Sequence, residues 1–306
     1  MDIINGYQMT GKFLAENAGF CKWGFAQKDG HEYFIKEFLA PKYPLESHEL
    51  DPVTAEKKKK QCERFFEEKT ALYRAIGACR TGNVIAVEDF FRNGAKYYAV
   101  TQRVAPAKMS LEQIARLDPQ KKYALIRSLT YSFARLHSRS VVHADIKPEN
   151  ILIKKTEAGF YTGKIIDFDS GFLENSVPEE IQGDQVYLAP EVRLHMMGEA
   201  AAITTKVDIF ALGILFHQYW TGNLPAMFPG YDYLFESVLD DSPIFLDEGV
   251  PPAMRIIIER MLGKDPESRP SAAKILRALD VIMFGRTYSP PVSDTGDKGF
   301  RPLGDL

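Results

Sequence analysis

The chain has 306 residues, of which 45% are hydrophobic, 12% aromatic and 26% charged. These proportions are ordinary for a folded protein and exclude disorder as its main state, and the length allows one large bilobal unit or two domains. With 38 basic and 41 acidic residues and a formal net charge of −3, the chain has no general electrostatic attraction for nucleic acid or for an anionic membrane. We therefore expect neither as a partner.

Three scattered cysteines, Cys21, Cys62 and Cys79, form neither a disulfide framework nor the paired spacing of a zinc site. The first residues lack the basic start and apolar run of a secretory signal. The longest apolar stretch, residues 207–220, contains polar side chains and is shorter than the roughly 20 residues that span a bilayer. These features predict a cytoplasmic protein.

Strand-like patterns dominate the first hundred residues. Three antiparallel strands are expected within residues 7–38, where an Asp-Gly pair marks a hairpin, and two more at residues 84–90 and 96–104, which an Asn-Gly pair joins. The charged segment 54–76 predicts a long helix. Together these patterns predict five antiparallel strands with one main helix.

From residue 110 onward the pattern becomes helical. Asp118 followed by Pro119 is typical of a helix cap and first helical residue, and apolar residues follow at intervals of three and four. Further helices are predicted at residues 207–220, 254–262 and 271–279. Gly222 is expected to end the first of these, and the Gly- and Pro-containing residues 285–306 are predicted to be a flexible tail.

The most informative stretch is His143-Ala144-Asp145-Ile146-Lys147-Pro148-Glu149-Asn150, which is flanked by apolar residues. An apolar strand follows it and ends at Asp167. Two acids and an amide in this order suit phosphoryl transfer, in which one aspartate accepts a hydroxyl proton while the asparagine and the second aspartate hold magnesium. A lone loop aspartate is more often a turn or a cap, but that interpretation does not account for the whole string.

These motifs resemble the eukaryotic-type protein kinase family, in its serine/threonine branch, with irregularities similar to those of bacterial members. The resemblance covers nearly all of residues 7–284. It implies an α+β, bilobal fold, with a small five-stranded antiparallel β N-lobe, one main helix and a larger, mainly α-helical C-lobe. We expect a kinase domain at residues 1–284, with the N-lobe at 1–104 and the C-lobe at 105–284, before the tail at 285–306.

The resemblance also implies catalytic roles. Asp145 is the expected base, Lys147 is expected to steady the transferring phosphate, and Asn150 and Asp167 are the expected metal ligands. In the string Tyr33-Phe34-Ile35-Lys36, the lysine is the expected contact of the nucleotide phosphates.

The acidic partner of Lys36 is expected on the following helix. Glu68 fits because Leu72, four residues later, then faces the core; Glu67 and a plain surface glutamate remain alternatives.

The expected nucleotide contacts are Gly19, Thr101, Gln102, Val104 and Leu152, together with Lys36, Asn150 and Asp167. Thr101 would be a small residue beside the adenine, while Gln102 and Val104 would offer backbone groups to the base. The glycine-rich loop has only Gly19, and two alignments remain open. One puts Cys21 at the third glycine position and Trp23 over the adenine; the other puts Gly19 there and Cys21 over the adenine.

Several residues depart from the family pattern. Phe34 replaces a small alanine at the adenine, which implies a reshaped roof of the nucleotide site. Ala144 replaces an arginine that often pairs with an activation-segment phosphate, and Asp184 replaces a threonine near the catalytic lysine. Two structural residues match: Asp208 resembles the anchor of the catalytic loop, and Arg269 resembles the partner of the Glu191 position.

The predicted activity is transfer of the γ-phosphate of ATP, with Mg²⁺ or Mn²⁺, to Ser/Thr hydroxyls of protein substrates, including autophosphorylation. Two alternatives stay open: a pseudokinase that binds nucleotide without transfer, motivated by Phe34 and the poor glycine loop, and a small-molecule phosphotransferase of the aminoglycoside or choline kinase type. The segment 187–191, Asp208 and Arg269 argue against the latter, because they resemble the protein-kinase C-lobe.

Overall fold

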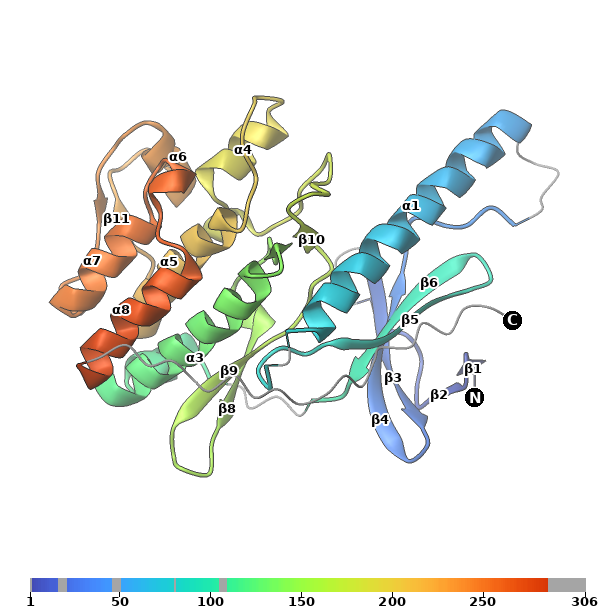
Figure 1. The fold of residues 1–306 in the computed structure, drawn as a ribbon, viewed down its shortest axis with the longest axis horizontal. Coiled ribbons are helices and arrows are strands. Elements are labelled where there is room, and N and C mark those ends of the chain that lie inside the picture. Colours follow the sequence, from blue (N-terminus) through green and yellow to red (C-terminus); the bar gives the residue numbers. More distant parts are fainter. Residues whose placement is uncertain (1, 16–20, 46–50, 80, 105–108, 286–306) are drawn as a thin grey trace. The chain divides into compact units, whose positions relative to one another are not determined.

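The computed structural model describes residues 2–15, 21–45, 51–79, 81–104 and 109–285. These residues fall into two compact units, each of which we describe by itself (Figure 1). The N-terminal unit holds the described residues up to Ala78 and from Ile85 to Val104; the C-terminal unit holds Cys79–Val84 and the described residues from Met109 onward. The domain limits expected from the sequence stay a prediction, and the expected tail falls outside the described residues apart from Gly285.

The N-terminal unit is built on one antiparallel sheet with the strand order β1-β2-β3-β4-β6-β5 (Figure 1). Its strands are β1 (Ile3–Ile4), β2 (Tyr7–Met9), β3 (Cys21–Lys28), β4 (His31–Phe38), β5 (Val87–Asn93) and β6 (Lys96–Gln102). Strands β2 to β6 are the five that the sequence predicts, and β1 is an additional one. A strand of two residues is too short to show an alternating pattern, so the expected count was one strand too low.

The β3–β4 hairpin sets the register of this sheet. Asp29 and Gly30 have φ angles of 49° and 78°, and a two-residue type I′ turn needs positive φ at both positions. Lys28 therefore lies opposite His31, and the pairing continues residue by residue to Cys21, which lies opposite Phe38. Since opposite residues point to the same face of a sheet, the turn decides which side chains of the two strands share a face.

Helix α1 (Pro52–Gly77) packs on one face of the sheet. It begins two residues before the predicted start because the carboxylate of Asp51 caps two N–H groups of its first turn. Phe65 of the helix packs edge-on against Phe38 of β4, with ring centroids 5.3 Å apart. The opposite face holds a buried apolar core formed by Ile4, Tyr7, Met9, Ala26, Ile35, Phe91, Tyr98 and Val100.

The C-terminal unit is mainly helical, as the sequence predicts. Its helices are α2 (Leu111–Ala115), α3 (Pro119–His137), α4 (Pro190–Met196), α5 (Lys206–Thr221), α6 (Leu234–Leu239), α7 (Pro252–Met261) and α8 (Ala272–Phe284), with 3₁₀ turns η1 (Pro148–Asn150), η2 (Gln185–Tyr187) and η3 (Pro266–Ser268). Short antiparallel pairs join β7 (Val141–Val142) to β10 (Phe172–Leu173), β8 (Ile151–Lys155) to β9 (Tyr161–Ile165), and β11 (Ala226–Met227) to β12 (Ile244–Phe245).

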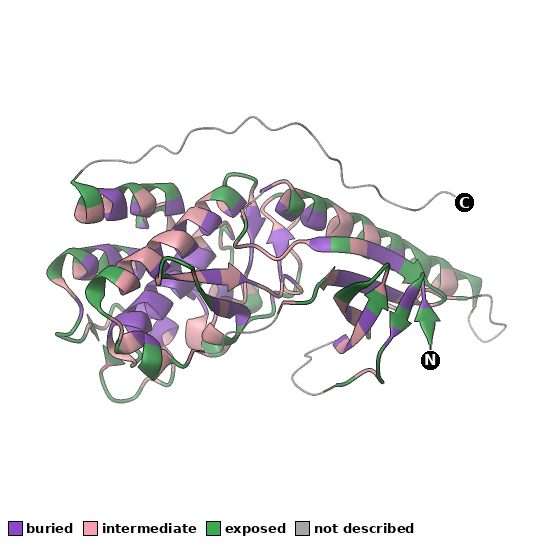
Figure 2. Cartoon of the chain, turned by 90° about the horizontal axis from the view of Figure 1, so that it is seen from below, coloured by how far each residue is buried: buried purple, intermediate pink, exposed green. Residues whose placement is uncertain are grey.

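Helix α5 is the buried support of this unit, and it contacts α2, α3, α7, η2 and η3. Every residue from Val207 to Trp220 is buried. Figure 2 shows buried residues within the helices of this unit. The helix ends as predicted at Gly222, whose φ of 81° is a left-handed conformation that glycine adopts readily. Although α5 is apolar, none of the helices that the structure describes combines the length and composition needed to cross a bilayer.

Candidate active site

The loop between β7 and η1 carries the predicted catalytic residues, and the buried Asp208 of α5 holds it in place. The Asp208 carboxylate accepts hydrogen bonds from the N–H groups of His143 at 2.9 Å and Ala144 at 3.0 Å, and it lies 3.0 Å from His137 Nε2. Ala144 needs this support because its φ of 63° lies in the left-handed region, which is unfavourable for a residue with a side chain. These contacts confirm that Asp208 anchors the loop.

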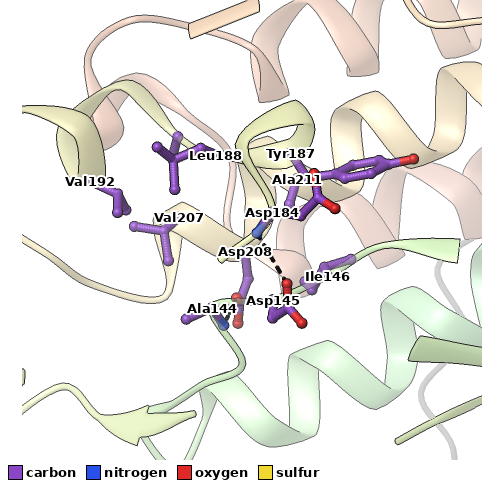
Figure 3. A pocket seen from close by; sticks show the side chains of 11 residues that line it. Ala144, Asp145, Ile146, Asp184, Tyr187, Leu188, Val192, Val207, Asp208 and Ala211 are labelled. Carbon is purple, nitrogen blue, oxygen red and sulfur yellow. Dashed lines mark hydrogen bonds between the residues drawn. The ribbon is translucent and has the colours of Figure 1, made fainter. Parts of the chain in front are cut away.

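Asp145 extends from this loop with both carboxylate oxygens engaged. Its Oδ1 accepts a hydrogen bond from the Asp184 N–H at 3.1 Å (Figure 3). Its Oδ2 accepts one from Asn150 Nδ2 at 2.9 Å. Lys147 Nζ lies 3.1 Å from Oδ1 and 2.9 Å from Oδ2. The Asp145 side chain is 16% exposed, so its carboxylate is held in one orientation while remaining accessible from solvent.

Lys147 keeps its positive charge in this setting. Burial by itself would lower the pKa of the ammonium group, but the hydrogen bond and the charge of Asp145 raise it, with further contributions from the charges of Asp184 and Glu149. The net effect raises the pKa of Lys147 above its ordinary value. A permanently charged donor beside the Asp145 carboxylate can stabilise negative charge on a reacting group.

Asn150 and Asp167 occupy neighbouring positions because β8 pairs with β9. The pairing continues past the strand ends, since the Ile166 N–H donates to the Asn150 carbonyl at 3.0 Å and Asp167 is the next residue. Asn150 Nδ2 also donates to the Asp145 backbone carbonyl at 2.7 Å, so both amide hydrogens are used and Oδ1 is the atom that can bind a cation.

This donor set fits a magnesium ion. An amide oxygen and a carboxylate are hard ligands of the kind Mg²⁺ prefers, and Mg²⁺ sites of this type are completed by phosphate oxygens and water. Among the described residues there is no group of three or more His, Cys, Asp or Glu side chains placed to hold a metal ion. The chain would therefore hold the ion mainly through Asn150 and Asp167, together with a phosphate-bearing ligand.

His143 joins the catalytic loop to the Asp167 segment, a role that the sequence did not assign. Its Nδ1 accepts a hydrogen bond from the Asp145 N–H at 3.3 Å, so Nε2 carries the proton and donates to the Ile166 carbonyl at 2.9 Å. The fully buried ring also packs against the ring of Phe168, with centroids 4.6 Å apart. The histidine was visible in the motif, but a single histidine does not indicate its partners.

Asp184 supplies a second contact that the sequence did not show. Its N–H binds Asp145, while its own Oδ1 accepts a hydrogen bond from the Val186 N–H at 3.0 Å and caps η2. Gly183 permits this close approach, because a Cβ at that position would lie 2.7 Å from the Ala144 carbonyl oxygen. A backbone N–H leaves no side-chain signal, so only the structure could reveal this bond.

In the N-terminal unit, Lys36 lies on the sheet face that α1 covers. It lies opposite Trp23 in β3 and Ala99 in β6. Phe34 and Phe38 stand two residues before and after it in β4, so the three side chains point to the same face. Since Phe38 contacts α1, the half-buried Lys36 side chain belongs to the same face. This face therefore carries the predicted phosphate-binding lysine next to Phe34, the residue that departs from the family pattern.

Three aromatic side chains cluster beside Lys36 on this face. Trp23 stacks on Phe34 with ring centroids 5.6 Å apart, and Phe25 packs edge-on against both, at 5.6 Å and 5.9 Å. The Arg103 guanidinium lies 4.2 Å from the Phe25 ring centroid and pairs with Glu32 at 3.2 Å. Phe34, which departs from the family pattern, is thus part of a packed aromatic cluster, and the reshaped nucleotide site expected from it stays a prediction.

The other residues predicted to contact the nucleotide lie in different parts of the structure. Thr101 lies opposite Phe34 and so shares the face of Lys36, while Gln102 lies opposite Tyr33. Leu152 is half-buried in β8 of the C-terminal unit. Gly19 lies outside the described residues, and Val104 is the last residue described before a gap. The nucleotide roles of these residues stay predictions.

Glu68 lies on α1, where its Oε1 accepts a hydrogen bond from Arg64 Nε at 2.8 Å. Leu72 is buried as expected, whereas Glu67 is exposed. The pairing of Glu68 with Lys36 stays a prediction.

Comparison with known proteins adds to this geometry. A family model described as the protein kinase domain matches residues 52–279, which is well over half of the chain. The chain belongs to the protein kinase family. This confirms the resemblance and the α+β fold predicted from the motifs. The matched region begins at α1, so Lys36 and the irregular glycine loop precede it.

The curated relatives are serine/threonine kinases, which confirms the branch predicted from the motifs. The chain is 30% identical to serine/threonine-protein kinase PkaA of Streptomyces coelicolor over 72% of its own length and 40% of the relative. It is 25% identical to serine/threonine-protein kinase CG17528 of Drosophila melanogaster, over 82% of this chain and 31% of that protein. With mitogen-activated protein kinase kinase kinase 8 of rat it shares 29% identity, over 55% of this chain and 36% of that protein. The chain thus spans less than half of the length of these relatives.

Proposed function

We propose that this chain transfers the γ-phosphate of ATP to Ser/Thr hydroxyls of proteins, with Asp145 as the catalytic base. The observation that carries the proposal is the Asp145 carboxylate, held by Lys147, Asn150 and the Asp184 N–H in a loop anchored on Asp208. A base must be fixed within hydrogen-bonding reach of the proton that it takes, and this carboxylate is both fixed and accessible.

In the proposed step, the substrate hydroxyl oxygen forms a bond to the γ-phosphorus while the bond from that phosphorus to the leaving oxygen of ADP breaks. Asp145 accepts the hydroxyl proton, and the Lys147 ammonium neutralises charge on the phosphoryl group as it moves. Asn150 and Asp167 would hold Mg²⁺, which neutralises phosphate charge when it is bound. Lys36, paired with Glu68, would hold the α- and β-phosphates.

The adenine of ATP would be bound by backbone groups of Gln102 and Val104, beside Thr101 and Leu152. The stacking of Trp23 on Phe34 favours the alignment in which Trp23 covers the adenine, because Phe34 stands at the adenine-contacting position. Autophosphorylation and a cytoplasmic location, the latter inferred from the scattered cysteines, belong to the same proposal.

Replacing Asp167 by Ala is expected to abolish Mg²⁺-dependent transfer while the fold survives, because the change removes one of the two proposed metal ligands. The measurement is transfer of labelled phosphate from ATP to a generic basic protein and to the chain itself, across a range of Mg²⁺ and Mn²⁺ concentrations. Retained transfer with an unchanged magnesium requirement would contradict the metal site. Nucleotide binding by the unmodified chain without any transfer would instead favour the pseudokinase alternative.

Activity is expected not to depend on phosphorylation of the activation segment. Ala144 stands where an arginine would hold such a phosphate, and no Lys or Arg occurs in residues 165–192. A phosphate there would lack the cationic partners that usually order such a segment. Phosphatase-treated protein is expected to retain its initial rate; loss of activity, restored together with a mapped phosphate in residues 170–186, would refute this.

A further inference from the structure

Residues 167–191, the activation segment, are attached to the rest of the C-terminal unit near both ends. Near the start of the segment, β10 pairs with β7. Toward its end, the Asp184 N–H donates to Asp145 Oδ1 at 3.1 Å (Figure 3), and the Tyr187 hydroxyl donates to Gln218 Oε1 at 2.7 Å. The segment is therefore fixed by contacts that the chain makes with itself.

Glu174 connects this segment to helix α5. Its Oε1 accepts a hydrogen bond from the Thr205 N–H at 2.7 Å. Its own N–H donates to the Ser140 carbonyl at 2.9 Å, which extends the β10–β7 pairing by one residue. One residue of the segment is thus bound through its backbone to the turn before β7 and through its side chain to the start of α5.

The group that binds the Glu174 carboxylate is the N-terminal end of α5. Thr205 is the N-cap residue of that helix, and its own side chain makes no capping hydrogen bond. The ammonium group of the next residue, Lys206, donates instead to the carbonyls of Pro266 and Arg269, at 3.0 Å and 2.8 Å. A backbone N–H at the positive end of the helix dipole therefore holds the carboxylate, and a hydrogen bond to a charged acceptor is stronger than one to a neutral acceptor.

The start of α5 supports two parts of the candidate active site at once. Asp208 lies in the first turn of the helix and anchors the catalytic loop, while Glu174 attaches the activation segment to the same end. Every residue from Val207 to Trp220 is buried, and such close packing resists displacement. The loop and the segment, which meet at the bond between Asp184 and Asp145, are thus aligned on one rigid support.

The composition of the segment favours a carboxylate in this role over a phosphate. Phosphate groups order such segments mainly by pairing with Lys or Arg. Residues 165–192 contain neither. The Glu174 carboxylate needs no cation, because its partner is a backbone N–H.

We propose that Glu174 is a positioning residue, which holds the activation segment of the unphosphorylated chain in the arrangement that brings the Asp184 N–H to Asp145. The inference rests on the proposed function for the reaction that this arrangement serves, but the order of the segment can be measured without catalysis. The hydrogen bonds of Glu174 go to Thr205 and Ser140, so it acts on the reaction through the segment and touches no reactant.

The first measurement is amide hydrogen exchange of the full chain after phosphatase treatment, without nucleotide. Glu174→Ala is expected to speed exchange of the Thr205 N–H and of the Ser176 N–H, which donates to the Leu173 carbonyl, by about 10–100-fold, the effect of losing a hydrogen bond to a charged group. Glu174→Gln keeps an acceptor oxygen without the charge and should lie in between. Glu179→Gln makes the same change at an exposed residue of the segment and should exchange like the unmodified chain.

The second measurement is transfer of labelled phosphate at varied concentrations of ATP and of a generic basic protein. Glu174→Ala is expected to lower kcat/KM for the protein by about 10–100-fold, in proportion to the loss of the ordered segment. The KM for ATP should stay the same, because the residues proposed to bind ATP lie outside the stretch between Glu174 and Asp184. A general loosening of α5 would instead disturb Asp208, lower kcat and reduce the midpoint of thermal unfolding together.

The outcomes distinguish the two proposals. Slow exchange that depends on Glu174, without transfer by the unmodified chain, would support the positioning role and count against the kinase activity. Transfer by Glu174→Ala at the rate of Glu179→Gln would overturn the positioning role and leave the activity in place. Exchange that is fast in the phosphatase-treated chain and slows only after phosphorylation of the segment would also overturn it, as would a loss confined to thermal stability.

Discussion

Asp145→Asn is expected to reduce phosphate transfer by about 10²–10⁴-fold, the usual contribution of a positioned base. The amide has nearly the same shape as the carboxylate but cannot accept the hydroxyl proton. The Asp184 N–H and the Asn150 amide both donate to the carboxylate. The asparagine side chain has only one acceptor oxygen, so its NH₂ group would face one of these two donors and that hydrogen bond would be lost. The measurement is the initial rate of labelled-phosphate transfer at saturating ATP, with thermal unfolding as a check on the fold.

A matched control separates this loss from a general effect of removing charge. Asp241 is 76% exposed, pairs with Lys264 at 2.6 Å and has a φ of 52°, a conformation that asparagine also tolerates. Asp241→Asn therefore makes the same chemical change in the same unit and should leave the rate unchanged. Transfer by Asp145→Asn at the rate of this control would show that Asp145 is not the base.

The parts of the fold that the sequence predicts well are those with a local cause. The Asp29-Gly30 turn, the Asp118 cap and the Gly222 end of α5 each depend on one or two residues with special backbone or capping chemistry. The aromatic cluster is also implicit in the sequence, because the two-residue turn puts Phe25 opposite Phe34 and Trp23 opposite Lys36. Knowledge of the register alone would have placed these rings together.

The parts that the sequence could not supply involve partners that carry no residue-specific signal. The Asp184 N–H and the Ile166 carbonyl are backbone groups that every residue has, yet they position Asp145 and His143. A small apolar hollow of the C-terminal unit likewise depends on Val186 meeting residues 224–234, which are far from it in the sequence. The motif therefore indicates candidate side chains, while the groups that hold them in place become visible only in three dimensions.

The largest expected effect on stability comes from the buried pair of Arg269 and Glu191, whose predicted pairing the structure confirms. The guanidinium donates to both carboxylate oxygens, at 2.7 Å and 2.8 Å, and the side chains are 0% and 5% exposed. Its other N–H groups donate to the carbonyls of Gly263, Lys206 and Lys264, so all five donors are used. Such a residue has no equivalent replacement.

Arg269→Met is expected to lower the free energy of unfolding by about 3–5 kcal/mol, because it leaves the Glu191 carboxylate buried without its cation. Urea unfolding of four proteins gives the test: the unmodified chain, Arg269→Met, Glu191→Met and the double variant. The double variant should lose less than the sum of the single losses, by about 0.5–3 kcal/mol, since neither charge is then left alone. It should still be less stable than the unmodified chain, because three backbone carbonyls have lost their donor. Strictly additive losses would show that the two residues stabilise the unit independently and that the pair itself contributes nothing.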